Sequence, residues 1–259
     1  MKQYCRDAGL KVGLLLLLSM LSVIAPVTAQ EPRDPQKIQV LLVTGEDYKE
    51  HPWRQLGPVL RDLLNADAKI DCRLADDMEI LGTDILFDYD VIFCNFKNYT
   101  PLKREAQARA NLVKFVEDGG GLMYFHFTCG AFQEWPGFEQ IAGRVWNPKL
   151  RGHDPHGTFT VRITDKNHPV TQGLNDFETL DELYTCLDGT RDIHILAEAT
   201  SKVDGRSYPI AFVFDQGKGR VFHTVLGHDL RALESPAVAV LLKNAARWTA
   251  GQRGEINKR

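Results

Sequence analysis

The sequence predicts an α/β fold with a doubly wound, mostly parallel sheet and an antiparallel C-terminal extension. Two observations carry this prediction. In the first half, short apolar runs alternate with amphipathic segments, which is the pattern of successive β-α-β units. In the second half, strand-like runs follow one another across turn-rich loops, as in antiparallel sheets. The 259 residues suffice for one large domain, and a hydrophobic content of 44% indicates a packed core.

The first predicted strand covers residues 38–43, an almost continuous apolar run. Such a run is typical of a strand that is buried on both faces of a parallel sheet. Leucines and a valine at helical spacing predict a helix over 53–64. Two further strands are predicted at 69–74 and 90–95.

A long amphipathic helix is predicted over 102–117, because Pro101 suits the first turn of a helix and the glycines at 119–121 suit its end. A fourth buried strand follows at 122–126. In doubly wound folds, ligands bind at the edge where the parallel strands have their carboxyl ends. His126 ends a strand of this kind.

In the second half, Gly217-Lys218-Gly219 lies between two apolar runs and has the chemistry of a hairpin turn. This favours an antiparallel extension from Asp192 onward. Ser235-Pro236 opens a last helix that runs through Trp248. The strand-like runs of this half are 158–163, 193–199, 209–214 and 220–226.

The N-terminus has the order of a secretory signal peptide: basic residues, then an apolar run over 12–24, then small residues up to Ala29. The apolar run is shorter than the roughly 20 residues of a spanning helix, which leaves an uncleaved anchor as the lesser alternative. We therefore expect an exported protein, periplasmic or extracellular, with no stable membrane span after cleavage. The expected segments are a signal peptide at 1–29, a flexible lead-in at 30–37, the folded domain at 38–251 and a polar tail at 252–259.

Charge and cysteine content exclude some classes of function. The net charge is −3 and the basic residues are scattered, so a nucleic-acid partner is not expected. Four cysteines remain after removal of the signal peptide, and their wide spacing matches neither a zinc ribbon nor a dense disulfide framework. The spacing does not settle whether any of them are paired. These four are Cys72, Cys94, Cys129 and Cys186.

Two histidines follow strands in positions where functional groups gather. His126 precedes a loop at the end of the fourth strand, and His228 follows the last predicted strand in Leu226-Gly227-His228-Asp229. We expect both imidazoles to face one pocket. His153 is a further candidate, since it lies in a polar loop. The weaker candidates are His51, His156, His168, His194 and His223.

A carboxylate pair beside an aromatic ring completes the predicted site. Asp181 and Glu182 stand next to Tyr184, a side chain that commonly stacks on polar ligands. Imidazoles with a carboxylate suit general acid–base chemistry or a divalent metal, and the sequence leaves both open. The candidate catalytic residues are His126, Glu182 and His228, and the candidate substrate-binding residues are His153, Asp181, Tyr184 and Asp229. The role of Glu182 is supported mostly by the family resemblance described below.

Cys129 follows the fourth strand, where some hydrolases place a nucleophile on a sharp turn. That turn requires glycines two residues to either side of the nucleophile, and this chain has Phe127 and Ala131 there. A buried or disulfide-bonded cysteine is the favoured interpretation. A catalytic thiolate is the alternative.

The ordered motifs resemble the ThuA-like (trehalose utilisation) family, within the class I glutamine amidotransferase-like superfamily. The resemblance covers residues 38–251. It implies a flavodoxin-like, class I glutamine amidotransferase-like sheet. The motifs are Ile-Gln-Val-Leu-Leu-Val-Thr-Gly at 38–45, Gly-Gly-Gly-Leu-Met-Tyr-Phe-His at 119–126, Gly-His-Asp-Pro-His at 152–156, His-Pro-Val-Thr-Gln-Gly-Leu at 168–174, Asp-Glu-Leu-Tyr at 181–184, Gly-Lys-Gly-Arg-Val-Phe at 217–222 and Leu-Gly-His-Asp at 226–229.

The resemblance further implies a small-molecule carbohydrate as partner. No amidotransferase elbow is present, so glutaminase activity is not expected. We expect chemistry on a sugar or 3-keto-sugar derivative, by His/Glu acid–base catalysis with or without a divalent metal. The alternatives are a non-catalytic sugar-binding module and a hydrolase dependent on Cys129. Whether the chain forms a homodimer is left open.

Overall fold

The computed structural model describes residues 33–46 and 50–251. The predicted signal peptide, the first part of the lead-in and the predicted tail at 252–259 lie outside these residues.

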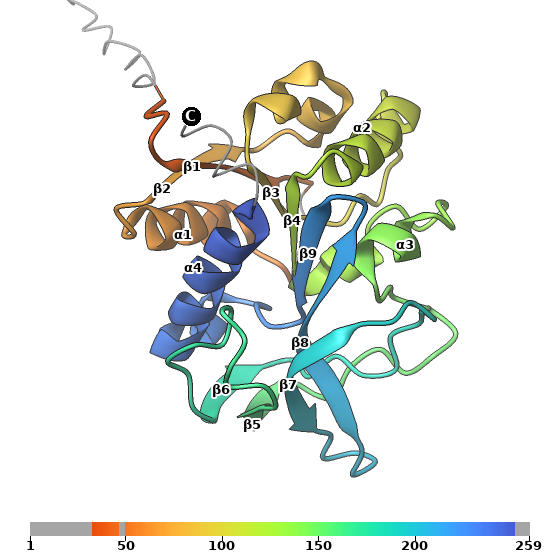
Figure 1. The fold of residues 1–259 in the computed structure, drawn as a ribbon. Helices are drawn as coiled ribbons and strands as arrows, with labels where there is room; N and C mark the ends of the chain where they lie inside the picture. The colour runs from red at the N-terminus through yellow and green to blue at the C-terminus, as the bar shows by residue number, and fades with distance from the viewer. Residues whose placement is uncertain (1–32, 47–49, 252–259) are drawn as a thin grey trace, which may run out of the picture. The chain divides into compact units, whose positions relative to one another are not determined.

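The described residues form a nine-stranded sheet in the order β2-β1-β3-β4-β9-β8-β7-β5-β6 (Figure 1). The first five strands in this order are parallel to one another. Their central members, β1, β3 and β4, are buried along almost their whole length, as the apolar runs predict. The parallel strands are β1 (Ile38–Thr44), β2 (Ile70–Ala75), β3 (Val91–Asn95), β4 (Gly121–Phe125) and β9 (Gly219–Thr224).

The remaining four strands pair antiparallel, from β9 outward to the edge strand β6. Gly217 has a φ of 58° and lies with Lys218 in the tight turn that joins β8 to β9, which confirms the predicted hairpin. The antiparallel part includes two strands that precede Asp192 in the chain. Its members are β5 (Gly157–Ile163), β6 (Phe177–Asp181), β7 (His194–Thr200) and β8 (Ser207–Gln216).

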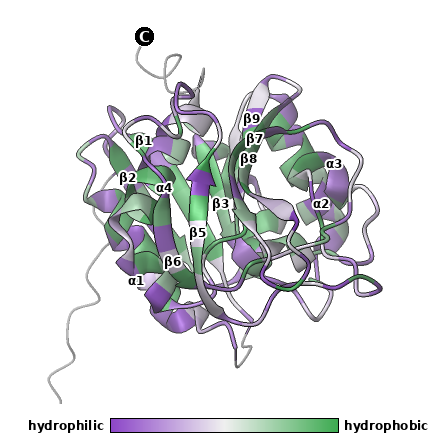
Figure 2. Cartoon of the chain, turned by 90° about the horizontal axis from the view of Figure 1, so that it is seen from below, coloured by the Kyte–Doolittle hydropathy of each residue, from purple (hydrophilic) through white to green (hydrophobic). Residues whose placement is uncertain are grey.

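Helices cover both faces of the parallel part, which confirms the doubly wound fold (Figure 1). One core cluster packs α1 (Trp53–Asn65) and α4 (Pro236–Ala250) against the sheet. A second cluster lies on the opposite face, under α2 (Glu105–Glu117) and α3 (Phe138–Ala142). Figure 2 shows the consequence for polarity: the central strands are hydrophobic, and hydrophilic residues lie on the outer sides of the helices. Two short 3₁₀ helices complete the second face, η1 (Met78–Gly82) and η2 (Asp84–Asp88).

Three local features differ from the prediction. Helix α2 begins at Glu105 and not at residue 102, because the residues before it form a tighter turn. The N–H of Glu105 donates to the Leu102 carbonyl oxygen at 3.2 Å, and the first α-helical hydrogen bond runs from Ala108 to Arg104 at 2.9 Å. Strand β4 ends at Phe125, and His126 begins a 3₁₀ helix, η3 (His126–Gly130). Strand β6 was not predicted, since its alternation is short and its edge position leaves it partly exposed.

The loop after β9 leads into η4 (Leu230–Glu234) and then α4. No helix among the described residues combines the length and the apolar character needed to cross a bilayer.

Candidate functional site

Four side chains from four separate segments of the chain meet at one edge of the sheet. His51, His126, Glu182 and His228 each offer one ligand-type atom, and these atoms lie within 4.8 Å of one another. His51 and His126 are buried, while Glu182 and His228 are partly buried. The two strand-end histidines and the Glu182 carboxylate that the sequence predicts are therefore brought together.

Strand direction explains why these residues converge. His51, His126 and His228 follow β1, β4 and β9, which are parallel and have their carboxyl ends at the same edge. Four successive antiparallel pairings separate β9 from β6, so β6 again points toward that edge and Glu182 follows its last residue. The site thus lies where doubly wound sheets present their ligand groups.

His126 has a backbone conformation that suits a functional position. Its φ is 46°, in the left-handed region that residues other than glycine rarely adopt. The ring Nδ1 lies 2.7 Å from the carbonyl oxygen of Val225, so Nδ1–H donates there and the Nε2 lone pair faces the cluster. Among the described residues, Nε2 has no hydrogen-bond partner and lies 3.8 Å from Oε2 of Glu182. Burial keeps the pKa of His126 well below its usual value, so the ring is neutral.

Glu182 and His228 form the closest pair in the cluster, with 3.1 Å between Oε2 and Nδ1. Burial disfavours the charged form of both groups, but the attraction between them favours the charged forms more strongly. The pKa of Glu182 is lowered, with His228 and His153 favouring the carboxylate. The pKa of His228 is raised because burial, which opposes its charge, is overcome by the close ion-pair contact with Glu182.

Asp181 holds two of these loops together. Its carboxylate is fully buried and accepts backbone N–H groups from Glu182 (2.8 Å), Gly227 (2.7 Å) and His228 (3.0 Å). Burial raises the pKa of Asp181 to about 7, against the effect of these donors. The contacts of Asp181 are therefore with the backbone of the cluster, and the predicted contact with substrate stays a prediction.

Gly227 allows the loop after β9 to lie close to β4. Its φ is 121°, and a Cβ at this position would lie 2.0 Å from two ring carbons of Phe125. Phe125 immediately precedes His126, so this close approach fixes the loop that carries His228 against the strand that carries His126. A glycine is required here by both conformation and space.

His51 is a weak candidate on sequence grounds, yet it belongs to the cluster. Its ring stacks on Phe127 at 4.3 Å between centroids, and it lies 5.1 Å from the His126 ring and 5.0 Å from the His228 ring. Burial, with the neighbouring His228, lowers the pKa of His51 to about 4. The signal that could have found it is its place in the loop after the carboxyl end of β1.

His153 and Tyr184 form one wall of the site. The rings stack at 5.6 Å, and Nδ1 of His153 lies 3.6 Å from Oε1 of Glu182. The His153 side chain is 38% exposed, the most open of the imidazoles around Glu182. Its Nδ1 is 2.8 Å from the carbonyl oxygen of Asp154, so Nδ1–H donates there and Nε2 is the basic nitrogen. Tyr184 is buried, and its ring is 4.5 Å from that of His126.

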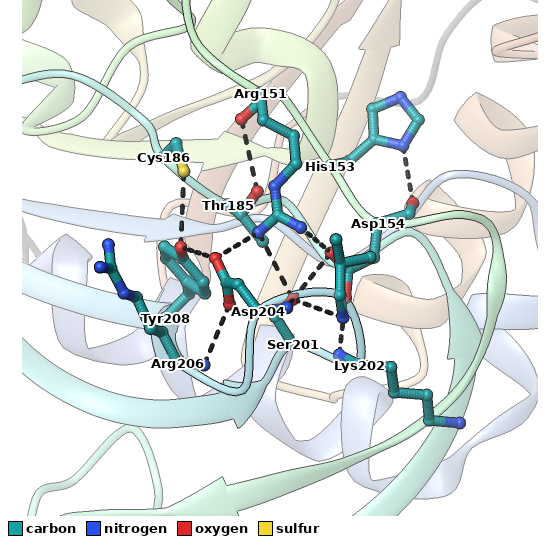
Figure 3. Close-up of polar contacts among 11 residues, drawn as sticks. Arg151, His153, Asp154, Thr185, Cys186, Ser201, Lys202, Asp204, Arg206 and Tyr208 are labelled. Atoms are coloured by element: carbon teal, nitrogen blue, oxygen red, sulfur yellow. Dashed lines mark hydrogen bonds and ion pairs between the residues drawn. The ribbon is translucent and has the colours of Figure 1, made fainter.

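A polar network behind His153 fixes its loop (Figure 3). The Arg151 guanidinium donates to Asp154 at 3.0 Å and to Asp204 at 2.8 Å, and the Tyr208 hydroxyl donates to Asp204 at 2.6 Å. Ser201 donates to Asp154 at 2.9 Å. This network ties the loop before β5 to the turn between β7 and β8.

Asp229 lies at the outer side of the cluster. Its carboxylate caps η4 by accepting the backbone N–H of Arg231 and pairs with the Arg231 guanidinium. His156, the weaker of the two loop histidines, lies 3.8 Å from this carboxylate, and its ring is 5.4 Å from that of His228. The predicted substrate contact of Asp229 stays a prediction.

The four described cysteines are unpaired: Cys72, Cys94, Cys129 and Cys186. Cys129 is buried on the first turn after β4, and burial raises the pKa of its thiol to about 12. A thiol of this kind is almost entirely protonated at neutral pH and is a poor nucleophile.

The cluster fits a divalent metal ion. Three imidazoles and one carboxylate are the donor types that Zn²⁺ and related transition metals prefer, with His228 giving up its proton when it binds the ion. The carbonyl bound to Nδ1 of His126 leaves Nε2 as the donor atom, an arrangement that usually orients histidine ligands. Glu182 would supply a negatively charged oxygen ligand. His51 would supply a nitrogen ligand from the segment that follows β1.

Comparison with known proteins gives the chain a family. The family described as ThuA, trehalose utilisation, matches residues 39–249. A ThuA-like protein from Parabacteroides merdae is 26% identical with a TM-score of 0.72, and the match covers 83% of this chain and 91% of that one. A ThuA-like protein from Bacteroides uniformis is 21% identical with a TM-score of 0.67, over 86% of this chain and 94% of that one.

The wider fold resemblance is also present. A protein described as a GMP synthase component from Thermoplasma acidophilum shares the fold at 13% identity and a TM-score of 0.52, over 86% of this chain and 98% of that one. No curated protein matches the chain. The match to the ThuA pattern spans nearly the whole described domain, and the fold agrees with it. The chain therefore belongs to the ThuA (trehalose utilisation) family.

Proposed function

We propose that this protein is a metal-dependent enzyme of carbohydrate metabolism that acts on a sugar ketone, such as a 3-keto-glycoside. The observation that carries the proposal is the convergence of His51, His126, Glu182 and His228 within 4.8 Å. The family to which the chain belongs suggests carbohydrate as the substrate class.

The buried residues of the cluster are suited to holding a cation. A bound divalent cation polarises a carbonyl or hydroxyl oxygen and stabilises negative charge that develops on it. His126 is too buried to exchange protons readily with solvent, and its Nδ1 is committed to Val225. We therefore assign His126, Glu182, His228 and His51 to the metal centre.

His153 is the best-placed proton carrier. It is half-exposed at the wall of the site, with Nδ1–H directed to the Asp154 carbonyl and Nε2 free to accept a proton. In the proposed reaction, Nε2 removes the proton from the carbon next to the ketone, and the electron pair moves onto the carbonyl oxygen. Where the carbon that lost the proton carries a hydroxyl, that hydroxyl passes its proton to the former carbonyl oxygen, and return of the abstracted proton to the former carbonyl carbon gives the isomeric ketone. Departure of the glycosidic oxygen, which takes up a proton, gives elimination.

The other interpretations predict different results. Without metal, the Glu182–His228 pair at 3.1 Å would itself serve as acid and base, and activity would survive chelation. A non-catalytic sugar-binding module would bind sugars without turnover. A hydrolase dependent on Cys129 has no support from its buried, protonated thiol.

The test combines metal analysis with turnover. Purified protein is analysed for bound metal and incubated with glucosides and 3-keto-glucosides, before and after treatment with a chelator. The informative variant is Glu182→Gln, and the matched control is Glu178→Gln, an exposed carboxylate on the strand that leads to Glu182. We expect turnover that is lost on chelation and in Glu182→Gln and is kept in Glu178→Gln. Turnover that is insensitive to both changes would refute the proposal.

We also propose that the protein is exported. The proposal is supported by the N-terminal sequence, in which basic residues are followed by an apolar run and then by small residues up to Ala29. Intact-mass measurement of the protein recovered from the cell envelope or the medium tests this proposal. The proposal predicts a chain that begins at Gln30, and recovery of the full-length chain from the cytoplasm would contradict it.

A further inference from the structure

Lys97 carries a half-buried positive charge next to the candidate metal centre. It follows β3, at the same edge of the sheet as the cluster. Its ammonium lies 4.8 Å from the centroid of the Tyr99 ring, and no described residue accepts a hydrogen bond from it or pairs with it as an anion. Because Lys97 is only partly buried and has no anionic partner in the described chain, its charge is available to an anionic group from outside the chain.

The position of Lys97 is tied to the turn that begins with His126. Its side chain lies along Gly130, the last residue of η3, where a Cβ would come within 3.4 Å of Nζ. Thr128, in the middle of η3, donates to the Cys94 carbonyl at 2.9 Å and accepts the N–H of Phe96 at 3.1 Å. These bonds fasten the end of β3 to η3.

A cavity of about 370 Å³ opens beside Lys97. This volume is within the range of small-molecule sites, roughly 300–1,000 Å³. The exposed ring of Tyr99 and the side chain of Gln133 line it. Of its two acidic residues, Glu105 is paired with Arg109, and Glu134 is exposed at the rim. Lys97 and Glu134 are thus the two charged groups of the cavity without a counter-ion among the described residues, and Lys97 is the more buried of the two.

We propose that Lys97 binds an oxyanion substituent of the sugar substrate, a carboxylate or a phosphate, and so makes the enzyme selective for acidic sugars. This inference rests on the proposed function, because it narrows the class of sugar substrate proposed there. An ammonium offers three donors and a compact charge, which suits either oxyanion.

The test measures binding of glucose, glucuronate and glucose 6-phosphate by calorimetry. Wild type is expected to bind glucuronate or glucose 6-phosphate at least about tenfold more tightly than glucose. Which of the two binds more tightly identifies the oxyanion. Lys97→Met should abolish the preference, Lys97→Arg should retain most of it, and Lys149→Met, at an exposed lysine remote in sequence, should leave it unchanged.

Three results would overturn the inference: equal affinity of wild type for all three sugars, binding of none of them, or an undiminished preference in Lys97→Met. Metal content separates this failure from failure of the proposed function. Lys97 contacts none of the four candidate ligands in hydrogen bonds or ion pairs, so Lys97→Met should keep the metal content of wild type. A metal-loaded enzyme without an acidic-sugar preference would refute the role of Lys97 alone.

Discussion

Gly227→Ala should disrupt both the stability of the domain and its metal site. The added Cβ would lie 2.0 Å from Cε1 and Cζ of Phe125, and the backbone φ of 121° is unfavourable for alanine. Overpacking of a core costs about 1–3 kcal/mol, and an L-residue at positive φ costs a further 1–2 kcal/mol or so. We therefore expect the free energy of unfolding to fall by about 2–5 kcal/mol.

Gly205→Ala is the matched control. Gly205 also has a positive φ, 71°, but no atom lies within 4 Å of its added Cβ. The Gly205→Ala variant therefore has the conformational cost without the clash, and its free energy of unfolding should fall by about 1–2 kcal/mol. The assay is urea denaturation followed by fluorescence, together with calorimetric titration of Zn²⁺. Gly227→Ala should also bind Zn²⁺ more weakly, because the clash separates the loop of His228 from the strand before His126. Equal stability of the two variants with unchanged Zn²⁺ binding would refute this reasoning.

Three further predictions follow from buried groups and from the network behind His153. Burial lowers the pKa of His223 to about 4, so the folded state binds fewer protons than the unfolded state and stability falls as pH drops below 6.5. The free energy of unfolding of wild type should therefore fall by about 2 kcal/mol between pH 7 and pH 5 because of this residue. In urea denaturation, His223→Gln should show a flatter pH dependence. Cys129 should resist alkylation in the native protein while the partly exposed Cys186 reacts, as peptide mapping would show, and Cys129→Ala should keep full turnover; rapid native labelling of Cys129 would contradict this. Arg151→Met should increase amide hydrogen exchange in the loop of His153 and in the turn after β7, and unchanged exchange would mean that the network of Figure 3 does not fix this loop.

Much of the fold could be predicted because the parallel strands are buried on both faces. Continuous apolar runs such as 38–43 are unambiguous when turns and amphipathic helices separate them. Strand β6 escaped prediction because its five residues lie at a sheet edge, with one face open to solvent. Helix α2 was predicted three residues too long, since the sequence does not reveal that residues 102–105 form a tighter turn before it.

The site was partly predictable for a related reason. Once β4 and the last strand are recognised as parallel, His126 and His228 are expected at one edge. The neighbourhood of Glu182 depends on four antiparallel pairings that return β6 to that edge, and sequence patterns do not give this order. The backbone-directed role of Asp181 also depends on long-range hydrogen bonds, to Gly227 and His228. His51 lies in a loop without periodicity, and only strand direction places it.

The most direct test of the account is calorimetric titration of the purified, metal-stripped protein with Zn²⁺. The account predicts one bound ion per chain in wild type, a loss of binding in His126→Gln, and normal binding in His194→Gln, whose exposed ring pairs with Asp165 away from the cluster. Absence of stoichiometric binding in wild type, or equal binding by all three proteins, would contradict it.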